Sequence, residues 1–560
     1  MKRSAVHAIL AFIAIVNFYC SSFAAGETAE KPIAILIYAS NPLYYELNLS
    51  SALSQKYNNF RIFYIDDGLH SWVLEGIYYW IREHDTQRRV TIITDHQQKG
   101  LLGNYWSIIH KYIEDDEIVI HLRADDWFEH EHVLKHINEL YQDESTWMTY
   151  AQFMVYPTMQ PGYCKQYPES VVLDNSWRKQ SLLLPYSHLC TFYGRLFKNI
   201  KLQDFIERNG FFPCAFESAF MYPMLEMAGN HVQFVPELLY IYNKRGINVP
   251  AEQNIYLKMA VARYIQEKQE YKPLRTLSCE AVQCDGVDII VFSFNRPMQL
   301  YALLESIERH MSGVGNISIL YRVTNDEYER GYKLVKDRFK KVKFVPQIMT
   351  PRNEFKMQTV ELVRQSSAYL MFGVDDIIVK DKINLKDCVS WIEKTKAYGF
   401  YLRLGKNIKK CYFPQAPINP DSSIKPYIEL DHHVCAWEFQ HGSHDWKYPN
   451  TLDMTIYRRD TALAPLTNLL YQTPNMLEGL WFGIADYQGI GLSYSFSKIV
   501  NLPLNVVQDD EFNNPHTIDI APEKLLRLFL DGLKIDIDAV YQINNESAHI
   551  DFIPPLVVRI

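Results

Sequence analysis

The sequence predicts an α/β fold arranged as two tandem domains. The first observation is a pair of short apolar runs, within Glu117–Trp127 and Ala368–Asp376, that have the length of central strands in a parallel sheet. Each run ends in two adjacent aspartates, and an amphipathic, helix-like segment follows. The second observation is that each acidic pair comes roughly ninety residues after an opening strand, at Ile33 and at Asp288. Two blocks with the same order of features predict an internally repeated architecture.

The two acidic pairs are the first candidates for a functional site. They are Asp125 with Asp126, and Asp375 with Asp376. Open α/β sheets bind their ligands at the carboxyl ends of the strands, where both pairs stand. Carboxylates on rigid backbone suit Mg²⁺ or Mn²⁺ and leave the remaining coordination to phosphate oxygens. We therefore expect these aspartates to bind a divalent cation. The alternative is that one aspartate of each pair only caps the following helix.

Length and composition agree with this organisation. A chain of 560 residues is too long for one core and suits two domains with additional segments. Its 48% hydrophobic and 22% charged residues are ordinary globular values. The formal net charge of −8 argues against a general nucleic-acid binder, which usually carries a basic surface.

The N-terminus is typical of a targeting segment. Lys2 and Arg3 precede an apolar run over residues 5–20, and small residues follow near Ala24 and Ala25. We expect residues 1–25 to be a cleaved signal peptide and the protein to be exported or to enter a secretory lumen. The alternative is an uncleaved membrane anchor formed by residues 5–20. No other segment approaches the length of a membrane span.

Several polar residues at strand ends and in loops are candidates for nucleotide binding. Asn41 follows the first strand, and Asp66 and Asp67 end the second, where a carboxylate can accept hydrogen bonds from a base or from ribose hydroxyls. The alternative for Asp67 is a simple turn with Gly68. Asn104 opens a helix that follows a glycine-containing loop.

The motifs of the first half resemble family 2 glycosyltransferases of the GT-A fold. The resemblance covers roughly residues 30–245 and includes YIDDG, GNYWSIIHKYI, IVIHLRADDWFEHEHVLKHINELY and FFPCAFESAFMYPMLEMAG. It implies a nucleotide-sugar donor. By the same resemblance Asp66 and Asp67 would hold the nucleoside, Asp125 and Asp126 the metal and diphosphate, and Glu217 would be the general base.

Arg123 departs from the family pattern. The family's strand end usually reads aspartate–any–aspartate–aspartate, and Arg123 takes the place of the first aspartate. An arginine there can neutralise phosphate directly through its planar fork of donors. Alternatively, the first domain has lost metal binding and is a non-catalytic copy.

The second half resembles a more distant member of the same fold class. FSFNRPMQLYALLESI has the strand, polar loop and helix of a glycosyltransferase opening, with Asn295 and Arg296 at the strand end. Asp326 stands after the next strand, where a base or ribose could be held, and Glu478 is the candidate general base. The expected domains are residues 30–272 and 285–506, followed by a tail over 507–560 with one amphipathic helix from Pro522 to Leu533.

These features together predict a glycosyltransferase. The enzyme would move a sugar from a UDP- or GDP-sugar to a hydroxyl group of a glycan or glycoprotein, with metal assistance and, as the family implies, with inversion. The alternative is a non-catalytic protein that binds glycan or nucleotide through two degenerate GT-A domains. Nucleotidyl transfer is a third reading, but neither opening loop is rich in glycine and arginine.

Overall fold

The chain folds into two compact units. The computed structural model describes residues 29–39, 43–66, 68–69, 71–94, 99–180, 188–245, 254–277, 285–347, 354–412, 425–431, 433–507 and 518–559. The first unit consists of Met1–Asn199 and Pro213–Cys279, and the second of Ile200–Phe212 and Glu280–Ile560. Residues 1–25 and the predicted site residues Asn41 and Asp67 lie outside the described residues.

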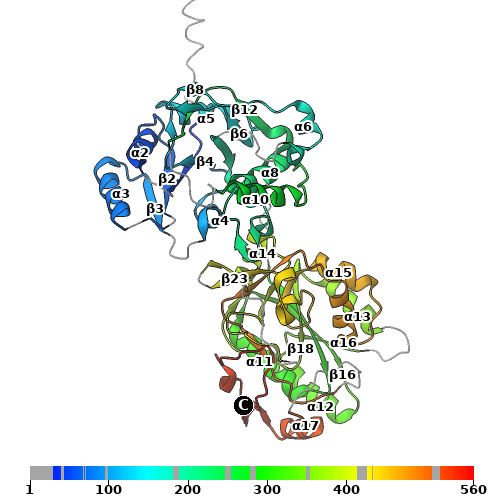
Figure 1. Cartoon of the computed structure of the whole chain (residues 1–560). Coiled ribbons are helices and arrows are strands. Elements are labelled where there is room, and N and C mark those ends of the chain that lie inside the picture. Colours follow the sequence, from blue (N-terminus) through cyan, green and yellow to red (C-terminus); the bar gives the residue numbers. More distant parts are fainter. Residues whose placement is uncertain are drawn as a thin grey trace, which may run out of the picture. The chain divides into compact units, whose positions relative to one another are not determined.

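The first unit is built on a mixed, mostly parallel sheet (Figure 1). Across the sheet its strands are β12 (Val232–Val235), β6 (Met148–Ala151), β9 (Cys190–Tyr193), β4 (Ile118–Arg123), β1 (Ile33–Ala39), β2 (Phe60–Asp66) and β3 (Val90–Thr94). Strands β1 and β4 are apolar and buried along almost their whole length, as parallel strands covered on both faces must be. Because β1 pairs in parallel with β2 and with β4, Asp66 and Arg123 lie on either side of its carboxyl end.

Helices and a small second sheet complete the first unit. The longer helices are α2 (Tyr45–Leu53), α3 (Ser71–His84), α4 (Gly100–Tyr112), α5 (Val133–Leu140), α8 (Phe216–Ala228) and α10 (Ile255–Glu267). The small sheet has the order β5 (Trp127–Phe128), β13 (Tyr240–Asn243), β7 (Met154–Tyr156) and β8 (Gln160–Pro161). Strand β5 directly follows Asp125 and Asp126, so this small sheet brings β13 next to the acidic pair.

The second unit has a nine-stranded sheet whose first seven strands repeat the plan of the first unit. In order they are β17 (Lys343–Pro346), β16 (Val314–Arg322), β14 (Val287–Phe294), β18 (Tyr369–Val374), β24 (Thr455–Arg458), β21 (Gly399–Tyr401), β25 (Ile490–Tyr494), β23 (Val434–Glu438) and β22 (Ile428–Asp431). In both units the chain visits these seven positions in the same sequence. In both, β4 or β18 is parallel to the opening strand on one side and antiparallel to β9 or β24 on the other.

The equivalence extends to the elements around the sheet. In the first unit α8 comes between β9 and β12, and in the second α16 (Pro474–Gly483) comes between β24 and β25. Strand β5 pairs antiparallel with β13, as β19 (Ile377–Val379) pairs with β26 (Ile499–Asn501). The other helices of the second unit are α11 (Pro297–His310), α12 (Asp326–Arg338), α13 (Glu354–Gln365), α14 (Leu385–Thr395), α15 (Arg459–Asn468) and α17 (Pro522–Leu530).

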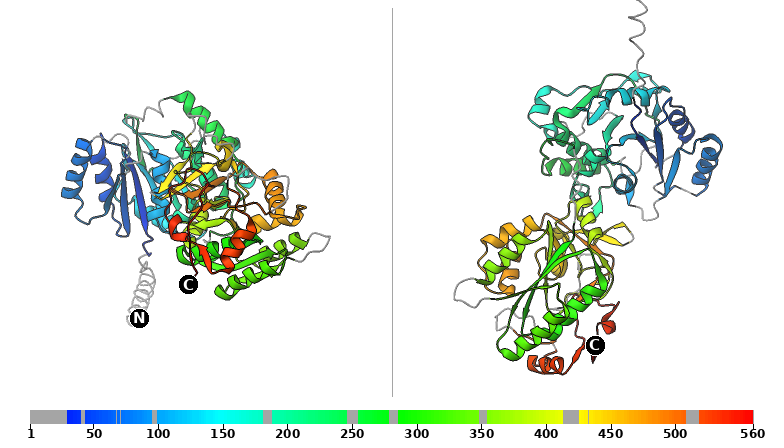
Figure 2. Two further views of the ribbon diagram at one scale, coloured as in Figure 1. Left: turned by 90° about the horizontal axis from the view of Figure 1, so that it is seen from below. Right: turned by 180° about the vertical axis from the view of Figure 1, so that it is seen from behind.

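The C-terminal tail forms part of the second unit. Its helix α17 ends at Leu530, three residues before the predicted end, and packs against α11 and α12 (Figures 1 and 2). The amphipathic pattern explains this packing, because Leu525, Leu526 and Phe529 are all buried. No helix in the described part of the chain is long and apolar enough to span a membrane.

One segment departs from the predicted domain limits. The expected domain over 30–272 included Ile200–Phe212, but this segment clusters with the second unit. It forms a short hairpin of β10 (Ile206–Glu207) and β11 (Gly210–Phe211). Asn209, between these strands, bonds Glu438 twice: its backbone N–H donates to the carboxylate at 2.8 Å, and its side chain accepts the Glu438 N–H at 2.7 Å. These buried bonds hold the hairpin within the second unit.

Candidate active site

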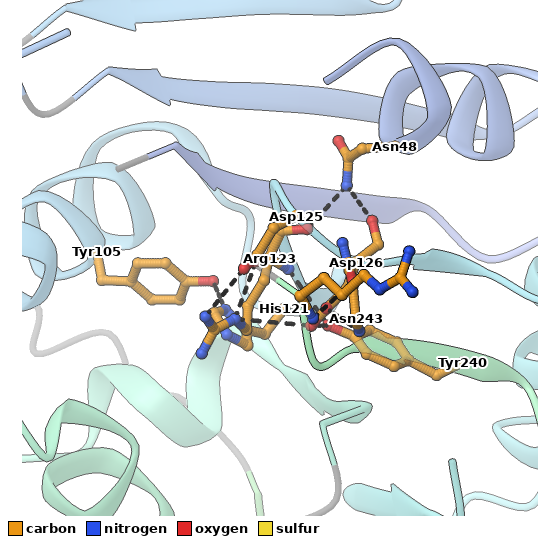
Figure 3. Close-up of polar contacts among 9 residues, drawn as sticks. Asn48, Tyr105, His121, Arg123, Asp125, Asp126, Tyr240 and Asn243 are labelled. Carbon is orange, nitrogen blue, oxygen red and sulfur yellow. Dashed lines mark hydrogen bonds and ion pairs between the residues drawn. The ribbon is translucent and has the colours of Figure 1, made fainter. Parts of the chain in front are cut away.

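The acidic pair of the first unit is bridged by Arg123 (Figure 3). The guanidinium donates from Nε and Nη2 to the two oxygens of Asp125, at 3.2 and 3.3 Å. Its Nε also lies 3.6 Å from Oδ2 of Asp126. Arg123 ends β4, so the chain itself places a cation two residues before the first carboxylate. The fork that we expected to meet phosphate is therefore directed at Asp125.

Asp126 is fully buried and fully engaged. Its Oδ2 accepts the hydroxyl of Tyr240 at 2.7 Å, and its Oδ1 accepts the backbone N–H of Asn243 at 2.7 Å. Burial raises the pKa of Asp126 to about 7, against the lowering effect of Arg123. The Asn48 side chain anchors the same turn by donating to the carbonyls of Arg123 and Asp126, at 2.8 and 2.7 Å. This geometry does not fit a metal ligand at Asp126.

A second buried cluster lies beside the first pair. In Figure 3 the hydroxyl of Tyr105, on α4, points at Nδ1 of His121, on β4, and the two atoms form a short hydrogen bond. Burial and then the Arg123 charge lower the pKa of His121 to about 3, so this imidazole is neutral. Glu217 stands in the first turn of α8 and, after burial and Cys190, contributes to the raised pKa of Tyr105. The structure thus brings Glu217 close to Tyr105.

Two further predicted residues of the first unit have structural roles. Asp66 is 3% exposed, and its Oδ1 accepts the backbone N–H groups of Gly68 and Leu69 at 3.1 and 2.8 Å. These bonds form a turn, which was the alternative to ribose binding for the Asp-Gly segment. Asn104 is buried on α4, at 3% exposure.

The second unit contains a cavity of about 1100 Å³ at the carboxyl ends of β14, β16 and β18. Five of the predicted residues line it: Asn295, Arg296, Asp375, Asp376 and Glu478. Asp326 does not line it. It is exposed at the start of α12, where Asn325 caps the helix by accepting the N–H groups of Glu327 and Tyr328. The prediction for Asp326 was therefore wrong, because the Asn-Asp pair begins a helix.

Arg296 and Asp375 form the fixed part of this site. Nη1 of Arg296 donates to Oδ1 of Asp375 at 3.0 Å and lies 3.5 Å from Oδ2 of Asp376. Nε and Nη2 of the same guanidinium bond the side chain and the carbonyl of Asn505. Oδ2 of Asp375 accepts the Ser293 hydroxyl at 2.8 Å and the Phe294 N–H at 3.2 Å. Asp375 thus accepts three hydrogen bonds from protein donors.

Asp376 keeps an open acceptor. Its Oδ1 is buried and has no hydrogen-bond partner among the described residues, and the side chain lines the cavity. Burial raises the pKa of Asp376 to about 6, opposed by Arg296 and assisted by Asp375. A carboxylate with one unpaired oxygen at a cavity wall is suited to a cation or to a ligand hydroxyl.

Glu478 lies on α16, the helix equivalent to the one that carries Glu217. Its Oε1 accepts the backbone N–H of Leu452 at 2.9 Å. Burial, and then the charge of Asp453, raise the pKa of Glu478 above its ordinary value. A carboxyl group with a raised pKa at the wall of a cavity is suited to act as a general base.

Two residues of the cavity were missed by the sequence analysis. Arg403 is 3% exposed and donates from Nη1 to Oδ2 of Asp453 at 3.0 Å. Asp453 precedes β24, which runs antiparallel between β18 and β21, and this placement brings residue 453 to the same strand ends as Asp375. In the sequence, Asp453 is a lone aspartate before the strand-like residues of LDMTIYRR. It forms no motif of distinctive spacing, so the sequence did not mark it as a site residue.

The two units differ in their fitness for a divalent cation. In the first unit Arg123 bridges Asp125, and both oxygens of Asp126 are engaged by protein donors. In the second unit Asp376 has one oxygen at the cavity with no partner among the residues that the structure describes. No group of three or more His, Cys, Asp or Glu side chains in the described ranges is arranged to hold a metal ion.

Sequence comparison gives the class of protein. The chain is 29% identical over 191 residues to the bifunctional glycosyltransferase pgtA of Dictyostelium discoideum. The match covers 31% of this chain and 24% of that protein, so the chain spans about a quarter of the length of its relative. Part of the chain is thus similar in sequence to a glycosyltransferase. No family model matches the chain.

Solved structures of glycosyltransferases align with the chain only loosely. TarS 1–349 of S. aureus is 14% identical over 42% of this chain and 65% of its own, with a TM-score of 0.28. The mannosyltransferase PcManGT of Pyrobaculum calidifontis, in complex with GDP-Man and Mn²⁺, is 13% identical over 48% and 75%, with a TM-score of 0.29. GalNAc-T7 with UDP, GalNAc and Mn²⁺ is 14% identical over 42% and 48%, with a TM-score of 0.30. These scores are too low to establish a common fold.

Proposed function

We propose that this protein transfers a sugar from a UDP- or GDP-sugar to a hydroxyl group of a glycan or glycoprotein, and that the reaction takes place in the cavity of the second unit. The observation that carries this proposal is the cavity at the strand ends, which gathers Arg296, Asp376 and Glu478 from elements far apart in the sequence. The relation to a curated glycosyltransferase supports the class of reaction. Ligand sites at this edge of an α/β sheet are the general rule.

Glu478 is the proposed general base. Its carboxylate removes the proton of the acceptor hydroxyl as that oxygen attacks the anomeric carbon, and the bond to the diphosphate oxygen breaks. Attack from the face opposite the leaving group inverts the anomeric centre. Bonds from the Leu452 N–H and the Thr451 side chain hold this carboxylate in place before an acceptor binds.

Arg296 and Asp376 are proposed to receive the diphosphate end of the donor. The guanidinium is held between Asp375 and Asn505, so its position is set before any ligand binds. Asp376 would hold Mn²⁺ or Mg²⁺ through its unpaired oxygen, with the phosphates completing the coordination. When bound, the cation neutralises the charge that develops on the leaving diphosphate.

The first unit is proposed to be a binding or structural copy without metal-dependent chemistry. The observation that favours this reading is the pairing of Arg123 with Asp125, together with the complete burial of Asp126. The alternative of a wholly non-catalytic protein would require the second cavity to be inactive as well. Export by residues 1–25, with anchoring by residues 5–20 as the alternative, remains part of the proposal.

Donor turnover tests the proposal. Protein lacking residues 1–25 is incubated with UDP- and GDP-sugars, with and without Mn²⁺, and release of UDP or GDP is measured. We expect metal-dependent release that Asp376→Asn abolishes and that the matched variant Asp126→Asn leaves in place. Binding of nucleotide without release would favour the non-catalytic alternative. Absence of both binding and release in a folded sample would refute the proposed function.

A further inference from the structure

The cavity of the second unit is lined by a buried arginine, Arg403, two of whose nitrogen donors have no partner among the described residues. Arg403 lines the cavity and uses Nη1 for Asp453, at 3.0 Å, with Oδ1 of Asp445 at 3.6 Å. Its Nε and Nη2 are buried and have no hydrogen-bond partner within the described residues. Leaving two guanidinium donors unpaired in a buried position is costly. The arrangement is explained if a ligand supplies two acceptor atoms.

An acceptor lies close to these donors. Asn501 is 1% exposed and also lines the cavity. Its amide nitrogen donates to Oδ1 of Asp453 at 3.0 Å, and its Oδ1 is buried without a partner in the described part of the chain. Asp453 thus links Arg403 and Asn501. The ligand that satisfies this wall must both accept and donate hydrogen bonds, as a hydroxyl group does and an anion does not.

The charge around Arg403 also argues against an anionic ligand. Asp445, Asp453 and Glu478 are its main electrostatic neighbours. Three carboxylates already compensate one guanidinium, so a further negative charge would be repelled. Hydroxyl groups carry no charge and meet no such penalty.

Aromatic side chains form another part of the same wall. The rings of Tyr448 and Phe482 stack with centroids 4.3 Å apart and an interplanar angle of 16°. Both residues line the cavity, together with Tyr487, whose ring meets Phe482 edge-on. An apolar surface beside paired hydrogen-bond donors and acceptors suits a ring that is apolar on its faces and polar at its edge. A sugar ring has this character.

We propose that the inner end of the cavity is a subsite for an uncharged sugar ring, in which two adjacent hydroxyls accept hydrogen bonds from Nε and Nη2 of Arg403 and a further hydroxyl donates to Oδ1 of Asn501. The inference rests on the proposed function, because glycosyl transfer brings sugar rings to this cavity. It goes further in assigning Arg403 as a specificity residue that selects neutral sugars over uronic acids. The ring belongs either to the donor or to the acceptor.

Calorimetric binding tests the subsite independently of turnover. The donor arm compares UDP with UDP-glucose, UDP-galactose and UDP-glucuronate, and GDP with GDP-mannose. The acceptor arm titrates neutral methyl glycosides into UDP- or GDP-saturated protein. The test variant is Arg403→Lys, which keeps the charge that pairs with Asp453 but has no fork of donors. The matched control is Arg338→Lys, which alters an exposed arginine paired with Glu308.

We expect a gain in affinity in one of the two arms, the donor arm or the acceptor arm, according to where the ring binds. For wild-type protein the neutral sugar should there raise the affinity about tenfold or more over the protein without it, the effect of one or two hydrogen bonds to a charged donor. Arg403→Lys should remove this gain while the affinity for UDP or GDP alone stays within twofold. Arg338→Lys should retain it, and UDP-glucuronate should bind at least tenfold more weakly than UDP-glucose or UDP-galactose in a donor-arm site.

Three results would overturn the inference. They are a sugar gain that survives in Arg403→Lys, no sugar gain in either arm while the nucleotide still binds, or, where the gain is found in the donor arm, equal binding of UDP-glucuronate and the neutral UDP-sugars. Protein that binds no nucleotide at all would instead refute the proposed function. If Arg403→Lys does not fold, as judged by circular dichroism, Tyr448→Leu takes its place. That variant removes the aromatic face and should lose the same sugar gain without loss of nucleotide affinity.

Discussion

Replacing Glu478 by glutamine separates its chemistry from its structural role. Oε1 of Glu478 accepts the Leu452 N–H at 2.9 Å, and a glutamine oxygen can keep this bond. The fold should therefore survive the change. Glutamine cannot take the proton of the acceptor hydroxyl, and general base catalysis contributes about 10²–10⁴ in rate. We expect kcat to fall by that factor, which corresponds to about 2.7–5.4 kcal/mol in the activation free energy.

The pH dependence of the same reaction gives a second readout. Burial and the Asp453 charge raise the pKa of Glu478, and only the deprotonated carboxylate can act as a base. Turnover should therefore rise with pH as Glu478 loses its proton, with a midpoint above the ordinary range of a glutamate. Glu478→Gln should remove this acidic limb along with most of the rate.

The assay is release of UDP or GDP at saturating donor and acceptor, over a pH series. Glu217→Gln is the matched control, because α8 and α16 occupy equivalent places in the two units. It should keep the full rate. If Glu478→Gln retains a third or more of kcat with an unchanged acidic limb, the base lies elsewhere. If Glu217→Gln is the variant that loses activity, the reaction belongs to the first unit.

Three other changes test the bonds that build the two sites. Arg296→Met leaves Asp375 buried without its cation, so urea unfolding should show a loss of about 3–5 kcal/mol in the free energy of unfolding, and an unchanged midpoint would contradict the pairing. Asp126 has its pKa raised to about 7 in the folded state, so it makes wild-type stability fall as the pH rises from about 4 to 7. Melting temperatures of Asp126→Asn should fall less steeply over this range, with Asp376 and Glu478 supplying the slope that remains, and curves parallel to wild type would disprove the shift. Asn48→Ala removes one buried and one partly buried hydrogen bond to main-chain carbonyls, so chemical unfolding should report a loss of about 2 kcal/mol in the free energy of unfolding. A difference under about 0.5 kcal/mol would exclude this role.

Local pattern was sufficient to locate the acidic pairs. The apolar runs before Asp125 and Asp375 form β4 and β18, and both pairs stand at strand ends as expected. Arg296 and Glu478, both predicted site residues, line the cavity of the second unit. They could be predicted because the order of strands and helices along the chain indicates which elements end at the same edge of the sheet. These features depend on periodicity within a few residues.

Features that depend on distant pairing were not predictable in this way. Arg403 and Asp453 come together because β24 lies between β18 and β21 in the sheet. No residue spacing in the sequence predicts this strand order. Asp326 failed for a local reason, since Asn325 is a strong helix cap and directs the chain into α12. The hairpin at residues 200–212 lies inside the stretch that the motifs assigned to the first domain. Its bonds with Glu438 nevertheless hold it in the second unit.

The arginine beside each acidic pair comes from a different place in the two units. Arg123 pairs with Tyr38 across β1, whereas Gly373, the residue at the corresponding place before Asp375, pairs with Val291 across β14. The second arginine, Arg296, instead follows the end of β14. Two non-equivalent positions therefore bring a guanidinium to equivalent carboxylates. The shared strand order thus does not dictate which residue balances the charge of two aspartates at this strand end.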